Sequence, residues 1–345
     1  SLTDNSLAII SGSNAQQDID KAYLGLIRNF KRLFWFVLCE FGHSSVIDKS
    51  FVDGRDNDLE PLNDSDLFKK GATSLRMSEI GYQSKAQKNL NIKYNDLDEF
   101  LDEVKSAITT PYPEFENLGL KDSEGEFHQI SSGILQIENE LYDCIRPKRA
   151  GSSGERPYEL LKKEGIKYLE VRGIDLDPED LAGISKDKIL LLDLIMLYCA
   201  IKPSSLMSDE EKSVIESNDI ATIKSGRLPE TIISYKDQPT TIAESRIDVI
   251  KDLMQIAAAM NDPKYIEVIS SMNTKVNIFN PDKSFHSLGL EKARENSLDL
   301  KSNMEIDTHK FKEEAEASLL KFKKIQATAN FDKIDEFMNS YNTKI

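Results

Sequence analysis

One pattern near the amino end restricts the fold of this chain more than any other. Across residues 17–41, apolar side chains recur every three or four positions, which is the repeat of one helix face. The members of this stripe are Ile19, Tyr23, Ile27, Phe30, Phe34, Val37 and Phe41. A helix with so continuous an apolar face must bury it against other elements, so the pattern predicts a long core helix.

Two segments in the middle of the chain change to a period of two, the period of a β-strand. They are residues 129–142 (QISSGILQIENELY) and 166–174 (IKYLEVRGI), and each places carboxylates on one face. Helical spacing continues over 97–109, 189–200 and 242–260, and two amphipathic helices are predicted after these. The predicted fold class is therefore α+β, with a partial antiparallel sheet and a large helical layer.

Local signals mark several boundaries of these elements. Asn95 is the expected N-cap of the helix over 97–109, and Ser208 with Glu211 is expected to form a capping box. Residues 44–72 are dense in Gly, Pro, Asn and Asp, which predicts a surface loop. The last helix is predicted to bury one face, formed by Phe331, Ile334, Met338 and Tyr341.

The composition excludes several classes of protein. The 345 residues include 59 Asp and Glu against 44 Lys and Arg, and the net charge of −15 repels nucleic acid and anionic lipid surfaces. Three scattered cysteines have no disulfide or zinc-site spacing, and only Cys144 lies beside a basic run and is a candidate for reactivity. No apolar run reaches the roughly 18–20 residues of a spanning helix, and no secretory signal opens the chain. We expect a cytoplasmic protein without nucleic-acid or membrane partners.

The polar face of the second predicted strand is the first candidate site. Tyr168, Glu170 and Arg172 project to the same side of that strand, at a spacing suited to one ligand or metal ion. Glu138 and Glu140 of the other predicted strand would bring further carboxylates, which Mg²⁺ prefers as ligands. An edge strand with a solvated polar face is the alternative explanation.

A local basic run is the second candidate site. The segment YDCIRPKRAGSSGERP contains Arg146, Lys148, Arg149 and Arg156 next to a loop of small residues, which suits phosphate binding. It is not a P-loop, because the glycine spacing and the terminal Lys-Ser/Thr are missing. An exposed hairpin and loop would have the same sequence.

A third candidate site comprises Arg76 and Tyr82, in a stretch without periodicity. Arginine can hold a substrate carboxylate with two hydrogen bonds, and a tyrosine hydroxyl can add another, although a surface salt bridge explains the arginine equally well. The four histidines are scattered, and neither a GxSxG nor a GxGxxG motif occurs. Hydrolase triads and dinucleotide-binding folds therefore lose support.

Four strings of the sequence occur in one order that resembles a known family. They are ATSLRMSEIGY (72–82), LQIENELYDCIRPKR (135–149), SGERP (153–157) and GIKYLEVRGIDLDP (165–178). Together they resemble the glutamate-cysteine ligase family of the proteobacterial type. The resemblance implies a fold similar to the catalytic sheet of glutamine synthetase. It also implies ATP-dependent joining of L-glutamate to L-cysteine through γ-glutamyl phosphate, the first step of glutathione synthesis, with Mg²⁺ as cofactor.

The resemblance also implies roles for individual residues. Glu170 matches a magnesium ligand, and Arg172 matches a catalytic residue near the transferred phosphoryl group. Arg76 matches the partner of the glutamate α-carboxylate. Tyr82 and Tyr142 match the positions that bind cysteine. Arg146 and Lys148 match the positions that bind phosphate.

The chain also departs from the family pattern. The family begins with a further third that carries most metal ligands, so residues 1–260 are expected to be the carboxyl-terminal two-thirds of the catalytic domain. Residues 261–345 are expected to be a helical extension packed on it. A monomer without activity on its own is expected. Where the family has Asn-Pro-Phe, this chain has Asp177, Pro178 and Glu179. The alternatives are a non-catalytic ATP- or amino-acid-binding or helical interaction module, and a ligase for another amine.

Overall fold

The computed structural model describes residues 4–52, 54–152, 155–177, 180–274, 308–328 and 334–343. Its helices are α1 (Asp4–Ser11), α2 (Gln16–Phe41), α3 (Leu97–Thr109), α4 (Pro113–Leu118), α5 (Pro157–Glu164), α6 (Lys186–Ile201), α7 (Asp209–Ser225), α8 (Ile242–Met260), α9 (Pro263–Thr274), α11 (Thr308–Thr328) and α12 (Ile334–Asn342). Its strands are β1 (Val46–Asp48), β2 (Glu60–Pro61), β3 (Asp66–Phe68), β4 (Ile145–Lys148), β5 (Tyr168–Val171), β6 (Ile232–Tyr235) and β7 (Gln238–Thr241). Short 3₁₀ turns are η1 (Lys49–Val52), η2 (Leu75–Met77), η3 (Lys85–Gln87) and η4 (Glu138–Glu140). The strands pair as small antiparallel sheets, so the α+β fold class is confirmed.

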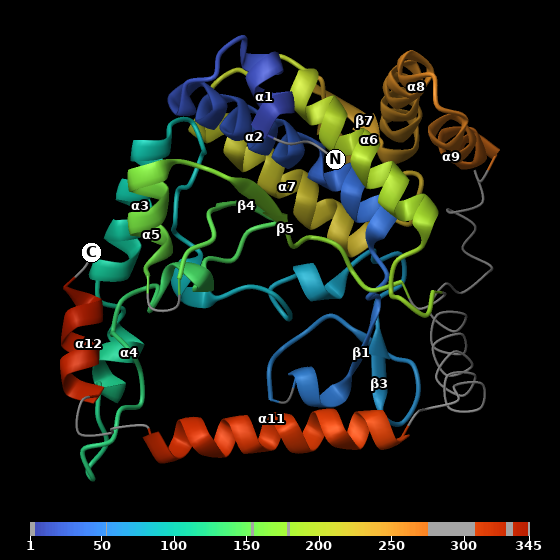
Figure 1. Ribbon diagram of the computed structural model, residues 1–345. Helices are drawn as coiled ribbons and strands as arrows, with labels where there is room; N and C mark the ends of the chain where they lie inside the picture. Colours follow the sequence, from blue (N-terminus) through green and yellow to red (C-terminus); the bar gives the residue numbers. More distant parts are fainter. Residues whose placement is uncertain are drawn as a thin grey trace.

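Helix α2 lies at the centre of the core, as its sequence predicts (Figure 1). Burial goes further than the predicted stripe, because every residue from Leu33 to Phe41 is buried. Helices α1, α6 and α7 pack around α2, and β4 contacts it on another side. The one carboxylate in this last stretch, Glu40, forms a buried ion pair with Arg246 of α8, as a charge in the core requires.

Strands β4 and β5 form the two-stranded ribbon that carries the candidate site. The alternation predicted over 166–174 is confirmed in β5, which is shorter than that range. Ile145 of β4 is completely buried, and Leu169 and Val171 of β5 pack against the same core. Immediately after β5 the backbone passes so close to α2 that a Cβ on Gly173 would lie 2.3 Å from the Phe34 ring. The ribbon is thereby fixed to α2, and Arg146 and Glu170 lie on the opposite face from Ile145.

The prediction of a strand over residues 129–142 is wrong. This segment consists of turns and η4. Its backbone amides donate to the carboxyl end of α3 instead of to a strand, from Ile134 to the Thr110 carbonyl (2.9 Å) and from Leu135 to the Ala107 carbonyl (3.0 Å). The last carbonyls of a helix lack partners within the helix, so this segment satisfies them. Glu138 and Glu140 therefore do not line a sheet.

Two further expectations are corrected. The surface loop predicted over 44–72 contains the small sheet β1-β3-β2. The helix over 97–109 is confirmed, but its N-cap is Asp96, whose carboxylate accepts from the amides of Asp98 and Glu99. Asn95 instead forms two hydrogen bonds with the Met207 backbone and so ties this segment to the start of α7.

At the start of α7, Ser208 caps the Glu211 amide as predicted. The Glu211 carboxylate, which a capping box would use on the backbone, instead forms an ion pair with Arg32 of α2 at 2.6 Å. A complete capping box occurs at α8, between Thr241 and Glu244.

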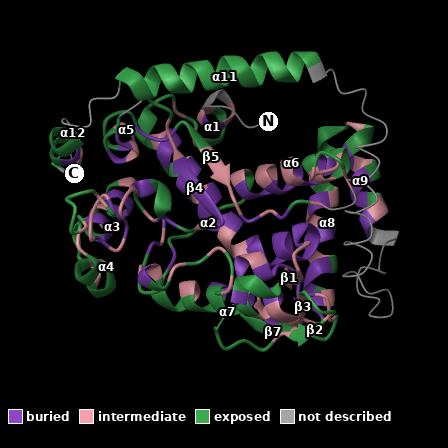
Figure 2. Cartoon of the chain, turned by 90° about the horizontal axis from the view of Figure 1, so that it is seen from below, coloured by how far each residue is buried: buried purple, intermediate pink, exposed green. Residues whose placement is uncertain are grey.

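The helices after α9 differ sharply in burial. Residues 309–328 of α11 are all exposed, and the helix lies along one side of the molecule (Figures 1 and 2). Helix α12 contacts Arg156, the residue before α5, through the Tyr341 carbonyl. Met338 is buried and Tyr341 half-buried as predicted, but Ile334 is exposed. Phe331 of the predicted face lies outside the described residues. None of the described helices has both the length and the apolar character needed to cross a membrane.

Candidate substrate-binding site

The register of β4 and β5 creates a charged face. Arg146 pairs with Glu170 across the ribbon, and Lys148 pairs with Tyr168. Paired residues of antiparallel strands point to the same side. The Arg146 guanidinium donates through Nε and Nη2 to Oε2 of Glu170, at 3.2 and 2.6 Å, and the Lys148 ammonium lies 4.0 Å from the same oxygen. The two predicted phosphate-binding residues thus meet the predicted metal ligand.

These contacts and the burial of the ribbon shift the pKa values of Glu170 and Lys148. Burial disfavours the charge on Glu170, but the hydrogen bond and charge of Arg146 outweigh it and lower the pKa of the carboxyl. Burial, and next the charge of Arg146, lower the pKa of Lys148. Arg146 itself is buried, with its Nη1 donating to the carbonyls of Asn139 and Leu141, both at 2.9 Å. Arg146 is therefore held rigidly from both sides.

Aromatic rings connect this pair to two more arginines. Tyr82 and Tyr142 meet edge to face, with ring centroids 4.3 Å apart. The Arg172 guanidinium lies 4.8 Å from the centroid of Tyr82, and that of Arg76 lies 5.9 Å from it. Among the described residues, none forms an ion pair or a side-chain hydrogen bond with Arg172, so its N–H groups are available to donate to an anion.

The hydroxyl of Tyr82 is buried and has no hydrogen-bond partner among the residues that the structure describes. Burial raises the pKa of this hydroxyl, although Arg172 and Arg146 oppose the shift. It therefore stays protonated at neutral pH. A buried hydroxyl without a partner is uncommon, and a bound ligand or a water molecule can supply the missing partner.

Asp175 is a site residue that the sequence analysis missed. Its Oδ1 accepts from Nε of Arg76 at 2.6 Å, and its Oδ2 accepts from Ser44 Oγ and from the amides of His43 and Ser44. Nη2 of Arg76 donates to the carbonyls of Arg172 and Ile174, at 3.0 and 2.9 Å. Arg76 is thus oriented by the segment directly after β5. None of the described residues accepts a hydrogen bond from its Nη1, which leaves this nitrogen for a ligand. No local sequence signal connects Asp175 to Arg76, because they are 99 positions apart.

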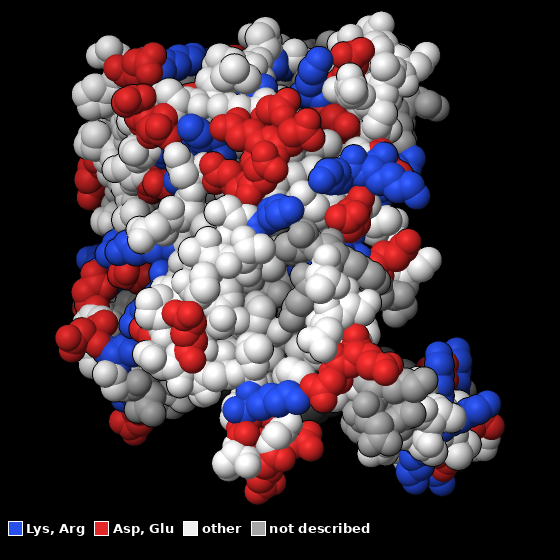
Figure 3. Space-filling model, turned by 90° about the vertical axis from the view of Figure 1, so that its left-hand side faces the viewer, with Lys and Arg blue, Asp and Glu red and all other residues white. Residues whose placement is uncertain are grey.

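The structure brings together all seven residues that the resemblance implicated. We call them the site cluster: Arg76, Tyr82, Tyr142, Arg146, Lys148, Glu170 and Arg172. Two basic residues of the same run lie elsewhere, since Arg149 binds Glu164 and the Gly165 carbonyl, and Arg156 binds Glu138. Pro178 and Glu179 lie outside the described residues. Acidic side chains gather in the upper half of the face of the molecule that Figure 3 shows. The site cluster, by contrast, has a surplus of cations and so suits an anionic ligand.

Metal ligands are scarce in the described part of the chain. No group of three or more His, Cys, Asp or Glu residues there could hold a metal ion. Glu170 contributes a single carboxylate, one oxygen of which already accepts from Arg146. Cys144 is also not a reactive thiol by environment, because burial, followed by the Asp143 charge, raises its pKa well above the usual value.

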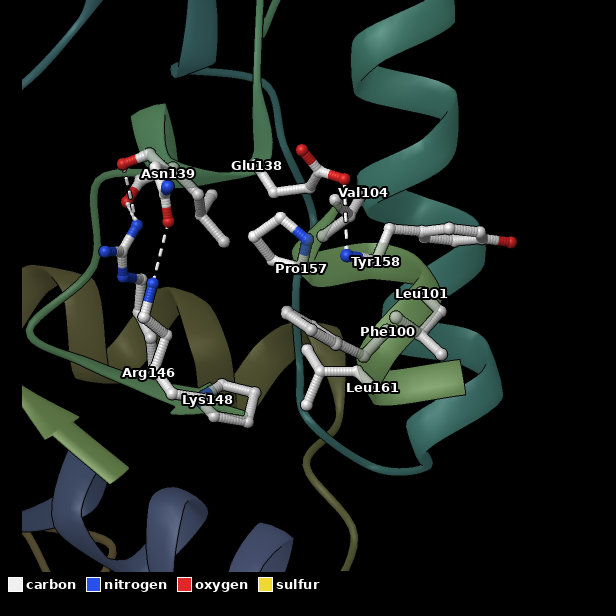
Figure 4. Close-up of a pocket in the computed structure, with 12 residues that line it drawn as sticks. Phe100, Leu101, Val104, Glu138, Asn139, Arg146, Lys148, Pro157, Tyr158 and Leu161 are labelled. Carbon is white, nitrogen blue, oxygen red and sulfur yellow. Dashed lines mark hydrogen bonds between the residues drawn. The ribbon is translucent and has the colours of Figure 1, made fainter. Parts of the chain in front are cut away.

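A small cavity of about 30 Å³ adjoins the site cluster (Figure 4). Arg146, Lys148 and Asn139 line one side of it, and apolar side chains of α3 and α5 line the other. Its volume is that of a single water molecule. The cavity is therefore too small for a substrate and marks the packing behind the site cluster.

His43, beside Asp175, gives a testable pH dependence. Burial lowers its pKa from 6.5 to about 4, while Asp177, 3.8 Å away, partly opposes this. The unfolded chain binds a proton between these pH values and the folded chain does not, so stability falls as the pH is lowered through this range. We expect His43 to lower the free energy of unfolding of the wild type by about 2 kcal/mol between pH 7 and pH 4.5.

Urea unfolding of the wild type and of His43→Gln at both pH values measures this effect. The variant should lose less stability on acidification than the wild type by that amount. Identical losses in the two proteins would contradict the assignment.

Comparison with known proteins agrees with this geometry. Residues 2–221 match the glutamate-cysteine ligase family. The chain is 33% identical over 344 residues to the glutamate–cysteine ligase of Pseudomonas savastanoi pv. phaseolicola, covering 94% of this chain and 64% of that protein. It is 43% identical over 212 residues to that of Hahella chejuensis, covering 61% of this chain and 40% of that protein. The chain therefore spans between two fifths and two thirds of the length of these relatives.

Two solved structures resemble the fold. The glutamate–cysteine ligase of Francisella tularensis, solved in complex with AMP, superposes with a TM-score of 0.83 at 26% identity, covering 99% of this chain and 70% of that one. A bifunctional glutathione synthetase from Pasteurella multocida is similar in fold alone, with a TM-score of 0.54 at 18% identity over 83% of this chain and 33% of that one. With the family match over residues 2–221, these results show that the chain belongs to the glutamate-cysteine ligase family.

Proposed function

We propose that this chain takes part in the ATP-dependent ligation of the γ-carboxyl group of L-glutamate to the amine of L-cysteine. The observation that carries the proposal is the position of Arg172. This cation has no ion pair among the described residues, and it lies over the ring of Tyr82, whose hydroxyl is buried without a partner. The AMP complex of the Francisella tularensis relative supports a nucleotide as co-substrate. In the family reaction, the glutamate γ-carboxylate attacks the γ-phosphorus of ATP, and the cysteine amine then displaces phosphate.

Each part of the site cluster fits one task in this reaction. Arg172 supplies charge to the phosphoryl oxygens, where negative charge must be stabilised as the phosphoryl group moves. Arg146 and Lys148 extend the positive field along the ribbon. Arg76, fixed by Asp175, offers its remaining nitrogen to the glutamate α-carboxylate. The Tyr82 and Tyr142 hydroxyls are suited to hold the carboxylate of cysteine.

Magnesium is a prediction from the family resemblance. The described residues do not form a magnesium site by themselves, because Glu170 is the only carboxylate of the site cluster and it is paired with Arg146. We therefore assign no step to a metal ion. Glu170 as a ligand stays a prediction, and its observed contacts give it the task of orienting Arg146.

The tyrosine pair provides a test by ligand binding. We expect Tyr82→Phe with Tyr142→Phe to weaken cysteine binding by about 30- to 1,000-fold, since each hydroxyl bond to a carboxylate contributes about 1–2 kcal/mol. Isothermal titration calorimetry of the 345-residue chain with cysteine measures this affinity. Tyr112→Phe is the matched control, because this half-buried ring lies next to α4 and outside the site cluster.

Two other outcomes would favour the alternatives. Folded wild-type chain that binds no glutamate, ATP or cysteine would favour an interaction module. Binding of glutamate and ATP without cysteine, but with another amine, would favour a ligase of different specificity, because selection among amines depends on pocket shape.

A further inference from the structure

Arg156 is a completely buried arginine outside the site cluster. Its guanidinium donates through Nε and Nη2 to the two carboxylate oxygens of Glu138, at 3.0 and 3.1 Å. The side chain of Arg156 is 0% exposed and that of Glu138 is 7% exposed. A buried ion pair of this kind loses much hydration, which offsets much of its attraction, so the pair by itself is weak evidence for a contribution to stability.

Glu138 opens the turn η4, and the same turn holds two cations of the site cluster. Nη1 of Arg146 donates to the Asn139 carbonyl at 2.9 Å, and Nζ of Lys148 donates to the Asn139 side-chain oxygen at 2.7 Å (Figure 4). The Glu138 carboxylate also accepts from the Tyr158 amide in the first turn of α5. The turn is therefore fixed at its first residue by Arg156 and Tyr158, and its next residue fixes Arg146 and Lys148.

Helix α12 supplies the remaining contacts of Arg156. Nη1 of Arg156 donates to the Tyr341 carbonyl at 3.0 Å, and the guanidinium lies 4.3 Å from the centroid of the Tyr341 ring. The helix is docked through buried Met338 and through an ion pair between Asp335 and Lys121 at 2.6 Å. Arg156 thus touches a helix near the carboxyl end with one nitrogen and the turn of the site with the other two.

We propose that Arg156 is a positioning residue that couples the docking of α12 to the turn η4 and so sets the orientation of Arg146 and Lys148. Undocking α12 removes two partners of the guanidinium and admits water to the pair between Arg156 and Glu138. A hydrated Glu138 no longer has to remain buried, so the turn can move and displace the Asn139 oxygens. Lys148 then loses its acceptor on the Asn139 side chain, and Arg146 loses one of the two carbonyls that hold its Nη1. What the site cluster binds rests on the proposed function, whereas the coupling does not.

Hydrogen exchange of the full chain tests the coupling. Met338→Asp should undock α12 without altering either charge, and we expect it to raise amide exchange at residues 138–148 by about tenfold or more, with α6 and α8 unchanged. Asn339→Asp is the matched control, because this exposed neighbour on the same helix receives the same substitution. Faster exchange confined to residues 334–343 would overturn the proposal.

Substitutions of Arg156 itself give a second set of measurements. Arg156→Gln should accelerate exchange at 138–148 and at 334–343 together. Arg156→Lys should give intermediate rates, because lysine keeps the charge but not the two-pronged geometry. Equal exchange at 138–148 in wild type and Arg156→Gln would also overturn the coupling.

Calorimetry with ATP separates this proposal from the proposed function. If the wild type binds ATP, Met338→Asp should weaken that binding by about tenfold, and Asn339→Asp should leave it unchanged. If the wild type binds no ATP but exchange at 138–148 follows α12 docking, the coupling holds and the proposed function fails. If ATP binding and exchange at 138–148 are both unchanged in Met338→Asp, the coupling fails and the proposed function stands.

Discussion

Replacing Arg172 with methionine is expected to weaken ATP binding to this chain by about 10- to 100-fold, because a charge-assisted hydrogen bond to phosphate contributes about 1.5–3 kcal/mol. The reason lies in its position. Arg172 follows β5, rests on the Tyr82 ring, and has no ion pair among the described residues. Its loss therefore removes a donor to the ligand without leaving a carboxylate unpaired. The fold should be preserved, since methionine keeps most of the side-chain volume.

The measurement is calorimetric titration with ATP, with circular dichroism as a check on folding. Arg55→Met is the matched control, because it removes one arginine from an exposed loop far along the chain. Equal affinity in Arg172→Met and Arg55→Met would contradict the role of Arg172. In any preparation with measurable ligation, turnover should fall by about 10²- to 10³-fold in Arg172→Met.

Asp175→Ala is expected to lower the free energy of unfolding by about 2–4 kcal/mol, because each buried donor left without an acceptor costs about 1–3 kcal/mol. The carboxylate is buried and accepts from Arg76, from the Ser44 hydroxyl and from two backbone amides. Alanine would leave both amides without an acceptor and would release Arg76 from the site cluster. Glutamate binding should weaken as well, because Arg76 would have to be ordered by the ligand.

Urea denaturation measures the stability change. Asp187→Ala is the control, since this exposed carboxylate in the first turn of α6 should contribute less than about 1 kcal/mol. If the two variants unfold at the same urea concentration, Asp175 does not connect the loop at His43 and Ser44 to the site.

Local periodicity predicts the helices and strands whose apolar residues repeat along one face. Helix α2, helix α8 and the polar face of β5 follow from the spacing of their own apolar residues, so the sequence suffices to find them. The segment 129–142 has the same alternation as a strand, but its amides are needed at the end of α3. That requirement depends on a contact across the fold, which local spacing does not contain.

The candidate site shows the same division. The spacing and charge of the sequence indicate six residues of the site cluster, the motif strings add Tyr142 and the separate roles, and the register of β4 with β5 explains why Arg146 meets Glu170. Asp175 has no such signal, and Arg156 is expected from the sequence to bind phosphate, whereas in the structure it pairs with Glu138. Each acts through a partner far along the chain, Arg76 and Tyr341 respectively, and a distant hydrogen bond leaves no periodic trace in a sequence.

A crystal structure of this chain soaked with ATP and L-glutamate tests the central claim most directly. The account predicts phosphate oxygens within hydrogen-bond distance of the Arg172 guanidinium, and the glutamate α-carboxylate at Nη1 of Arg76. It also predicts that the Tyr82 hydroxyl gains a partner in the complex with cysteine. Ligands bound elsewhere in the molecule, with the site cluster unchanged, would contradict it.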